Sequence, residues 1–265
     1  MPELQTVPDV ERRFAGLQRL YGMAGAAAIR QAHVAIVGLG GVGSWAAEAL
    51  ARSGVGTLTL IDLDHVSESN INRQIQALDS TVGQAKVLAM RERIGQIHPA
   101  CTVHCVEEFV EPGNWPQLLP PGVGAVIDAC DQVKAKTAIA AWALRSRGCI
   151  FVSAGAAGGK RLAHQVDIDD LARVTHDPLL AQLRSRLRKE HGAPREGKAF
   201  GVACVFSREA VAPPDLSCAI DGQGDGSLNC SGYGSVVSVT ATFGQCAAGW
   251  VLDQLASRKP SGTTL

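Results

Sequence analysis

The sequence predicts that residues 1–265 form one domain with an α/β fold, a doubly wound and mostly parallel sheet that is followed by a C-terminal elaboration. Short apolar runs alternate along the chain with longer segments in which apolar residues recur at helical spacing. Some runs, such as residues 33–37 and 125–130, are nearly all apolar, which is typical of strands buried on both faces of a parallel sheet. Right-handed crossovers then place helices on both faces.

The elements before residue 160 follow this alternation in order. Residues 1–30 are expected to form an N-terminal helical segment before the first strand. The expected strands comprise residues 33–37, 57–64, 102–109, 125–130 and 149–155. The expected helices comprise residues 42–53, 82–98 and 135–148. Gly54 and Pro99 are the residues that end the first two of these helices.

The rhythm changes in residues 160–265, the expected C-terminal elaboration. An amphipathic basic helix is expected over residues 177–190 and a further strand over 202–207. The loop 207–233 is rich in Gly, Ser, Pro and Asp, and we expect it to be mobile. Residues 232–252 carry no charge, but their Ser, Thr, Gln, Gly and Ala residues dilute the apolar character, so we expect a buried helix and not a membrane span.

Composition and charge narrow the compartment and the partners. The formal net charge is +0, so the protein as a whole does not steer a nucleic acid toward itself, although a local basic patch can still bind one. The eight cysteines form no C-x-x-C pair, and they are spread over the chain unlike a secreted disulfide framework. The N-terminal apolar run is too short for a signal peptide. We therefore expect reduced cysteines and a cytoplasmic protein.

The stretch IVGLGGVGS, residues 36–44, has the G-x-G-x-x-G spacing at Gly38, Gly40 and Gly43. It lies between an expected strand and an expected helix, where glycines let backbone N–H groups approach a phosphate. Asp62 follows 19 residues after Gly43, at the end of the second strand, where a Rossmann-like unit has its ribose-binding acid. The alternative is a tight turn without a ligand, but the order of strand, loop, helix, strand and acid favours a nucleotide site.

A charged and polar loop follows Asp62. Its candidate ligands are Asp62, Asp64, Asn70, Asn72, Arg73 and Gln74. Arg73 can grip phosphate oxygens through its planar fork, and Lys86, near the start of the next helix, offers a point charge to a triphosphate. Asp128 and Asp131, the two acids of a D-x-x-D in the stretch IDACD, lie at the carboxyl end of the fourth strand, where an acid beside a phosphate site suggests a Mg²⁺ ligand. Each residue alone could be an ordinary surface group or cap, but their order favours ATP over a hydride carrier.

These stretches resemble the adenylating superfamily that includes ubiquitin-activating enzymes and the ThiF- and MoeB-type activators of sulfur-carrier proteins. The resemblance rests on GLGGVGS, TLIDLDHVSESNINRQ, VGQAKV and IDACDQV. It implies catalytic roles for Arg73, Lys86 and Asp131, with Mg²⁺ at Asp131, and a homodimer whose N-terminal arginine, Arg13 or Arg19, reaches the neighbouring ATP. The nucleotide-binding residues expected in all are Gly38, Gly40, Gly41, Gly43, Asp62, Asp64, Asn70, Asn72, Arg73, Gln74, Lys86, Asp131, Arg13 and Arg19.

One branch of the superfamily is similar over nearly the whole chain, the tRNA threonylcarbamoyladenosine dehydratases. The similar stretches include RRFAGLQRLYG, INRQIQAL, LARVTHDPLLAQLRSRL and SGYGSVVSVTATFG. The resemblance implies that ATP adenylates the threonine carboxylate of the modified adenosine beside the anticodon. The ureido group then attacks the activated acyl carbon and expels AMP, so that the net change is loss of water. The tethered nucleophile makes this ring closure efficient.

The basic run of residues 184–198 and the cysteine Cys230 each admit two interpretations. The run is either a solvated helix face or a contact for RNA phosphates, with Arg184, Arg188 and Lys198 as candidates. Cys230 is either a thioester nucleophile or an incidental thiol, and the sequence around it shows no activating base, which favours the second.

Two other classes of function remain open. The chain could activate a ubiquitin-like or sulfur-carrier protein, but the bacterial activators usually hold zinc with two C-x-x-C pairs, which this chain lacks. It could also be a nicotinamide-binding dehydrogenase or a non-catalytic nucleotide-binding module, which would leave Arg73, Lys86 and Asp131 without a task. A sulfur-transfer protein is a further partner that the superfamily makes possible.

Overall fold

The fold is a seven-stranded sheet with the strand order β3-β2-β1-β4-β5-β7-β6, in a computed structural model that describes residues 9–146, 148–195, 197–213 and 233–258. The strands are β1 (His33–Val37), β2 (Thr57–Ile61), β3 (Thr102–Val106), β4 (Ala125–Asp128), β5 (Ile150–Ala154), β6 (Val166–Asp170) and β7 (Ala203–Ser207). All pairings from β3 to β7 are parallel, and β6 pairs antiparallel with β7 at the edge. The predicted mostly parallel α/β sheet is confirmed.

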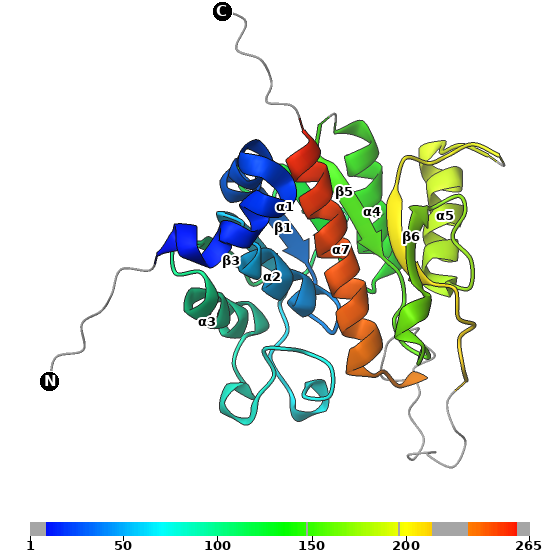
Figure 1. The fold of residues 1–265 in the computed structure, drawn as a ribbon. Coiled ribbons are helices and arrows are strands. Elements are labelled where there is room, and N and C mark those ends of the chain that lie inside the picture. Colours follow the sequence, from blue (N-terminus) through cyan, green and yellow to red (C-terminus); the bar gives the residue numbers. More distant parts are fainter. Residues whose placement is uncertain (1–8, 147, 196, 214–232, 259–265) are drawn as a thin grey trace, which may run out of the picture.

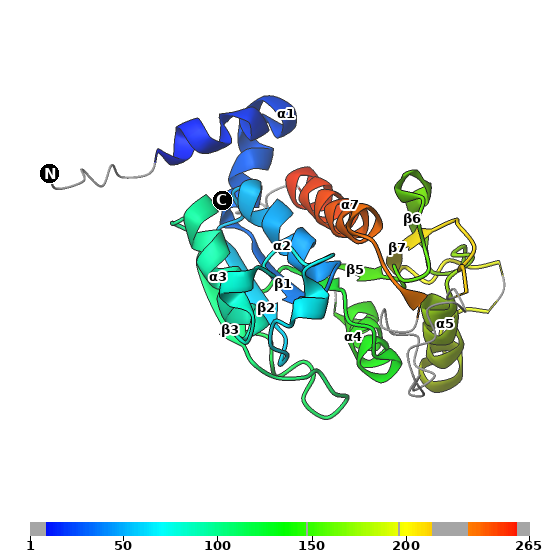
Figure 2. The ribbon, with the colours of Figure 1, turned by 90° about the horizontal axis from the view of Figure 1, so that it is seen from below.

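Helices cover both faces of the sheet. They are α1 (Val10–Gln31), α2 (Gly43–Arg52), α3 (Lys86–Ile97), α4 (Val133–Arg145), α5 (Pro178–His191) and α7 (Val237–Ser257). Short 3₁₀ turns lie at Glu68–Asn70, Asp79–Thr81 and Ala163–Gln165. In Figure 2, α4 and α5 lie on one side of the sheet, and α2 and α7 lie on the other. The doubly wound arrangement is therefore confirmed as well.

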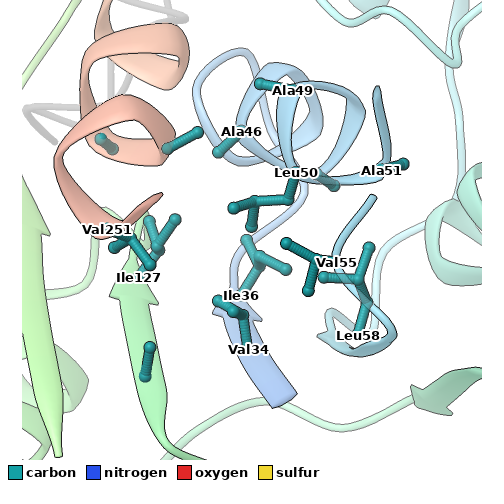
Figure 3. Packing of buried hydrophobic residues seen from close by; sticks show 14 of the residues in the cluster. Val34, Ile36, Ala46, Ala49, Leu50, Ala51, Val55, Leu58, Ile127 and Val251 are labelled. Atoms are coloured by element: carbon teal, nitrogen blue, oxygen red, sulfur yellow. The ribbon is translucent and has the colours of Figure 1, made fainter. Parts of the chain in front are cut away.

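Alternation along β1 shows how the sequence builds two cores. Val34 and Ile36 point to the face covered by α2 and α7, whereas Ala35 and Val37 point to the face covered by α4 and α5. Figure 3 shows Val34 and Ile36 packed beneath Leu50 of α2. Since both faces of the strand are buried, a nearly continuous apolar run is what this position in the sheet requires.

The expected strands ran two or three residues too far at their carboxyl ends. The chain leaves β2 after Ile61, β3 after Val106 and β4 after Asp128, and the following residues turn into the loops that line a cavity. Residues 82–85 are likewise not helical, because Ala85 forms an isolated bridge with His65 before α3 begins at Lys86. The sequence does not mark where strand pairing stops, so the residues after each strand resemble a continuation of it.

The C-terminal half contains one strand that the sequence pattern did not predict. Strand β6 has the sequence VDIDD, in which three acids interrupt the apolar pattern expected of a strand, although β6 pairs along its length with β7. The expected helix over 232–252 is α7, which begins at Val237 and continues to Ser257. Its apolar face packs on α2 and the sheet (Figure 1), as expected of a buried helix. Within the described residues, no helix combines the length and apolarity needed to cross a membrane. Residues 214–232 of the expected loop 207–233 lie outside the described residues.

Helix α1 lies at the amino ends of the strands. Its N-cap is Asp9, whose carboxylate accepts the N–H of Arg12 at 2.9 Å, and the helix is kinked at Gly22. Its last residue leads directly through Ala32 into the start of β1. Arg13 donates to the carbonyl of Ile97 at the end of α3, 2.6 Å away. The N-terminal helical segment thus lies at the end of the strands opposite to the loops at their carboxyl ends (Figure 1).

Candidate nucleotide-binding site

A cavity of about 370 Å³ opens at the carboxyl ends of the strands, where the loops that follow β1, β2, β3, β4 and β5 line it. Gly38 has a φ of +86°, and a side chain there would meet the backbone of Ala129 at 3.0 Å. At Gly43 a Cβ would lie 1.8 Å from the carbonyl oxygen of Gly38, so the loop closes only because this residue is glycine. Gly38, Gly40 and Gly41 line the cavity at the N-terminus of α2, a position that favours anions.

Asp62 braces the glycine loop from the end of β2. One carboxylate oxygen accepts the N–H of Leu39 at 2.5 Å, and the other accepts the N–H of Asp64 at 2.8 Å. The side chain is 8% exposed, and burial raises the pKa of this carboxyl, opposed by the positive charge of Lys86. The carboxylate therefore fixes the loop and still borders the cavity.

Two cations approach the cavity from the loop after β2 and from α3. Arg73 donates to the carbonyl of Ser69 at 2.6 Å and to Oδ1 of Asn72 at 3.0 Å. The Nζ of Lys86 lies 2.7 Å from Oδ2 of Asp64, and its side chain is 7% exposed. The guanidinium and the ammonium are thus already held in place by oxygen atoms of the protein, which limits the entropy lost when a phosphate binds.

The two acids of the D-x-x-D differ in their exposure to solvent. Asp128 is fully buried, and its Oδ2 lies 2.8 Å from Nζ of Lys136 and accepts the hydroxyl of Ser153 at 2.8 Å. Asp131 is exposed and borders the cavity. Only Asp131 of the two has a carboxylate available to a metal ion. No cluster of three or more His, Cys, Asp or Glu suited to a metal occurs among the described residues, so a Mg²⁺ ion here would share its coordination with phosphate oxygens and water.

The structure brings most of the predicted residues together around one cavity. Those that line it are Gly38, Gly40, Gly41, Asp62, Asp64, Asn70, Arg73, Gln74, Lys86 and Asp131. Gly43 does not line the cavity but packs against the carbonyl of Gly38 in the glycine loop. Asn72 does not line it either, and its side chain donates to the carbonyl of Ser235 at 3.0 Å. Arg13 and Arg19 lie on α1 and do not line the cavity of their own chain.

Several cavity residues could not be found from the sequence pattern. They include Ser69, Phe109, Gln132, Thr240 and the loop 155–158. Thr240 reaches Gly41 because α7 packs on α2, a contact between residues about two hundred positions apart that no local pattern announces. The sequence does contain a pattern that could have identified Lys136 as a buried residue. Lys136 lies on the apolar face of α4 with Ile139 and Ala140, where a lysine requires a buried partner.

The basic helix α5 presents a second groove, of about 490 Å³. Its lining residues are Ala181, Arg184, Ser185, Arg188, Lys189 and Arg195. Arg184 donates to the carbonyls of Leu171 and Val174 at 2.9 and 3.0 Å, so part of its function is structural. Arg188 lies over the ring of Phe200, with Cζ 5.3 Å from the centroid. Lys189, Arg195 and Lys198 are exposed. Cys230 lies outside the described residues, and the six cysteines within them are free thiols.

A glycine loop at a helix N-terminus, a buried strand-end acid and two anchored cations are the features of a nucleotide-binding α/β protein with room for a polyphosphate. The chain belongs to the ThiF family, whose model matches residues 11–263.

Relatives in two bacteria are similar over nearly the whole length. The chain is 44% identical over 254 residues to the tRNA threonylcarbamoyladenosine dehydratase of Escherichia coli, covering 93% of this chain and 94% of that one. It is 40% identical over 257 residues to the protein of the same name from Haemophilus influenzae, covering 96% and 97%. The crystal structure of the Escherichia coli enzyme in complex with ATP superposes with a TM-score of 0.84 at 42% identity, covering 94% of this chain and 96% of that chain.

Proposed function

We propose that this chain is an ATP-dependent tRNA threonylcarbamoyladenosine dehydratase. The observation that carries the proposal is the cavity at the carboxyl ends of the strands, in which the glycine loop, Asp62, Arg73, Lys86 and Asp131 meet. The family and the names of the two similar bacterial proteins support the same activity.

The reaction has two steps that balance in atoms. An oxygen of the threonine carboxylate attacks the α-phosphorus of ATP, and pyrophosphate leaves. The ureido nitrogen then attacks the acyl carbon, loses its proton, and AMP departs with one former carboxylate oxygen. Adenylation is needed because a free carboxylate is a poor electrophile, and the tethered nucleophile makes ring closure fast.

The residues of the cavity divide this work. Asp62 binds the ribose, and the glycine loop that leads into α2 binds the phosphates through backbone N–H groups. Arg73 and Lys86 stabilise the charge that develops on the α-phosphate and on the leaving pyrophosphate. Because both cations are anchored before ATP arrives, little reorganisation is needed in the transition state.

Asp131 is the residue that would hold Mg²⁺. It has the exposed carboxylate of the D-x-x-D, and one or two carboxylates together with substrate phosphates are the usual Mg²⁺ ligands. When bound, the ion would neutralise charge on the phosphate oxygens. Asp131 would help to orient the phosphates by holding the ion.

The proposed RNA contact is the exposed basic face of α5 and the loop after it. The candidates predicted from the sequence, Arg184, Arg188 and Lys198, are joined there by Lys189 and Arg195. Guanidinium and ammonium groups around one groove suit phosphates, which carry affinity without reading the sequence.

We also propose a homodimer in which Arg13 or Arg19 reaches the neighbouring cavity. Leu20 and Met23 on α1 are 73% and 70% exposed, which suits a helix that a second copy covers. Sedimentation that gives a monomer at micromolar concentration would contradict it. A sulfur-transfer partner and a cytoplasmic location remain expectations of the resemblance and of the free cysteines.

The experiment that tests the function uses purified tRNA that carries threonylcarbamoyladenosine. The protein is incubated with this tRNA, ATP and Mg²⁺, and the nucleosides are analysed by mass spectrometry. We expect a product lighter by one water, together with AMP and pyrophosphate. ATP–pyrophosphate exchange that depends on a carrier protein and not on tRNA would instead identify a carrier-activating enzyme.

A further inference from the structure

The side chain of Asp177 holds two elements at once. Its Oδ1 accepts the N–H of Leu180 at 2.9 Å and caps α5. Its Oδ2 accepts the N–H of Ala156 at 2.9 Å, and Ala156 belongs to the loop 155–158 that lines the cavity. A Cβ on Gly155 would lie only 2.0 Å from this same Oδ2, so glycine is required for the carboxylate to come this close.

Lys160 makes a second connection beside the first. Its side chain is 2% exposed, and its Nζ donates to the carbonyl of His176 at 2.9 Å and also to the carbonyl of Glu209. His176 has a φ of +56°, an uncommon conformation that persists only where surrounding contacts fix it. Residues 155–160 and 176–177, which we call the β5–α5 junction, are therefore joined at both ends.

The order of the strands shows which part of a bound nucleotide faces this junction. Asp62 follows β2, the glycine loop follows β1, Asp131 follows β4, and the loop 155–158 follows β5. With the ribose at Asp62 and the phosphates on the glycine loop, the β5 side is left for the carboxylate that attacks the α-phosphorus. The junction thus connects the wall on the acyl side of the cavity with the start of the basic helix α5.

We propose that Asp177 is a positioning residue: it sets the distance between RNA bound along α5 and the acyl side of the cavity, and thereby aligns the threonine carboxylate with the α-phosphorus. This inference rests on the proposed function. When α5 binds the RNA phosphates, the position of the modified nucleotide relative to α5 is fixed. The Ala156–Asp177–Leu180 contact fixes where the cavity wall lies relative to that helix.

Asp177→Asn separates positioning from capping. Asparagine caps a helix about as well as aspartate, so α5 keeps its Leu180 bond, but the amide NH₂ cannot accept the N–H of Ala156. Gly155→Ala breaks the same contact from the other side and leaves Asp177 unchanged. The matched control is Asp9→Asn, which alters the N-cap of α1, where the carboxylate bonds only Arg12 among the described residues.

The measurements are ATP affinity by calorimetry, tRNA affinity by anisotropy, and the single-turnover rate of conversion at saturating ATP and tRNA. For Asp177→Asn and for Gly155→Ala we expect both affinities to stay within about twofold, and the rate to fall by about tenfold or more, since misplacement near 1 Å can cost far more than that. The double variant should be impaired no more than either single one, because both substitutions break the same contact. Asp9→Asn should keep the wild-type rate.

Each outcome decides the inference. An unchanged single-turnover rate in a folded Asp177→Asn or Gly155→Ala variant overturns it, as does a slow rate at the wild-type ATP concentration that returns to the wild-type value when ATP is raised to saturation. If Asp177→Asn does not fold, Gly155→Ala alone gives the answer. A wild-type protein that binds ATP and tRNA but never converts the modified nucleoside would instead contradict the proposed function.

Discussion

Lys136 and Asp128 form an ion pair from which solvent is fully excluded: Nζ lies 2.8 Å from Oδ2, and both side chains are 0% exposed. The ammonium also donates to Ser153 Oγ at 3.1 Å and to the carbonyl of Ala154 at 2.9 Å. Burial by itself lowers the pKa of Lys136, but the Asp128 charge and its hydrogen bond help to raise the pKa above the ordinary value. The pair and its hydrogen bonds join α4 to the ends of β4 and β5.

Lys136→Met should destabilise the fold strongly. It leaves the Asp128 carboxylate buried without its cation, which typically costs about 3–5 kcal/mol of unfolding free energy. Urea unfolding measures the change, and Lys134→Met, at an exposed position of the same helix, is the control that should change little. Equal losses in the two variants would mean that the buried pair contributes nothing special.

This pair also shows where sequence reasoning reaches its limit. Asp128 and Asp131 are the same residue type three positions apart, and only the end of β4 between them decides which is buried and which borders the cavity. The glycine loop, Asp62 and Arg73 could be located because they follow local strand and helix boundaries. Thr240 could not, because it reaches the site through the packing of α7 on α2.

Strand β6 was missed for a related reason. Its acids Asp167 and Asp169 reduce its apolar character, yet Asp167 accepts a hydrogen bond from Arg208, 2.8 Å from Nε, just past the end of the paired strand β7. The partner of Asp167 is about forty residues away, so a window of neighbouring residues does not include it, whereas Asp169 pairs with the nearby Arg173. The apolar strands β1, β4 and β5 were predicted because the residues that make them buried are consecutive in the sequence.

Asp62→Ala should weaken ATP binding by more than tenfold, roughly 1.4 kcal/mol or more. The change removes the proposed ribose acceptor and also the carboxylate that accepts the N–H of Leu39 in the glycine loop. Calorimetry with ATP measures the affinity. Asp79→Ala, which alters an acid outside the cavity on a 3₁₀ turn of the same segment, is the control. Wild-type affinity in Asp62→Ala would exclude the proposed orientation of the nucleotide.

Arg73→Ala, Lys86→Ala and Asp131→Ala should each lower kcat by roughly 10² or more, with smaller effects on ATP affinity. Their charges act most where charge builds up, on the α-phosphate and on pyrophosphate, so that the transition state gains more than the ground state. Turnover of modified tRNA and ATP calorimetry separate the two quantities. Arg91→Ala, an exposed cation on the same helix as Lys86, should keep wild-type turnover. If all three variants turn over normally, the chemistry occurs elsewhere.

The fold should lose stability as the pH falls below 6.5, partly through His98. Burial lowers the pKa of His98 from its ordinary value of 6.5, and the charges of Arg13 and Arg30 lower it further. The unfolded chain therefore binds a proton near pH 6 that the folded chain does not, and stability decreases from pH 6.5 down to the folded-state pKa.

His98→Phe tests this dependence, because phenylalanine can keep the edge-to-face contact with Phe14 and cannot titrate. Its unfolding free energy should fall less with acidification than that of the wild type, by up to about 1.4 kcal/mol per pH unit. Urea unfolding at a series of pH values measures the slopes, and His65→Phe, at an exposed position, is the control. Parallel slopes for wild type and His98→Phe would assign the acid sensitivity to other groups.

Reversal of the exposed charges beside α5 should weaken tRNA binding without affecting ATP. Arg184 is a poor choice for reversal, because its bonds to Leu171 and Val174 support the fold. Lys189→Glu, Arg195→Glu and Lys198→Glu change exposed residues instead. Binding to RNA phosphates releases counterions, so the dependence of affinity on salt should flatten by about one unit of slope for each phosphate that the variant no longer binds.

Anisotropy with modified tRNA over a salt series measures that slope, beside ATP calorimetry on the same proteins. The control carries Arg91→Glu and Lys134→Glu, which reverse exposed charges on helices remote in sequence from α5 and should leave the slope unchanged. If tRNA affinity depends only on the total charge of the chain, which is zero in the wild type, each reversal should weaken binding equally in both sets. If tRNA binds a local patch at α5, only the reversals at α5 should weaken binding. Equal weakening per reversal in the two sets would therefore identify α5 as an ordinary solvated helix face, with the RNA held on another surface.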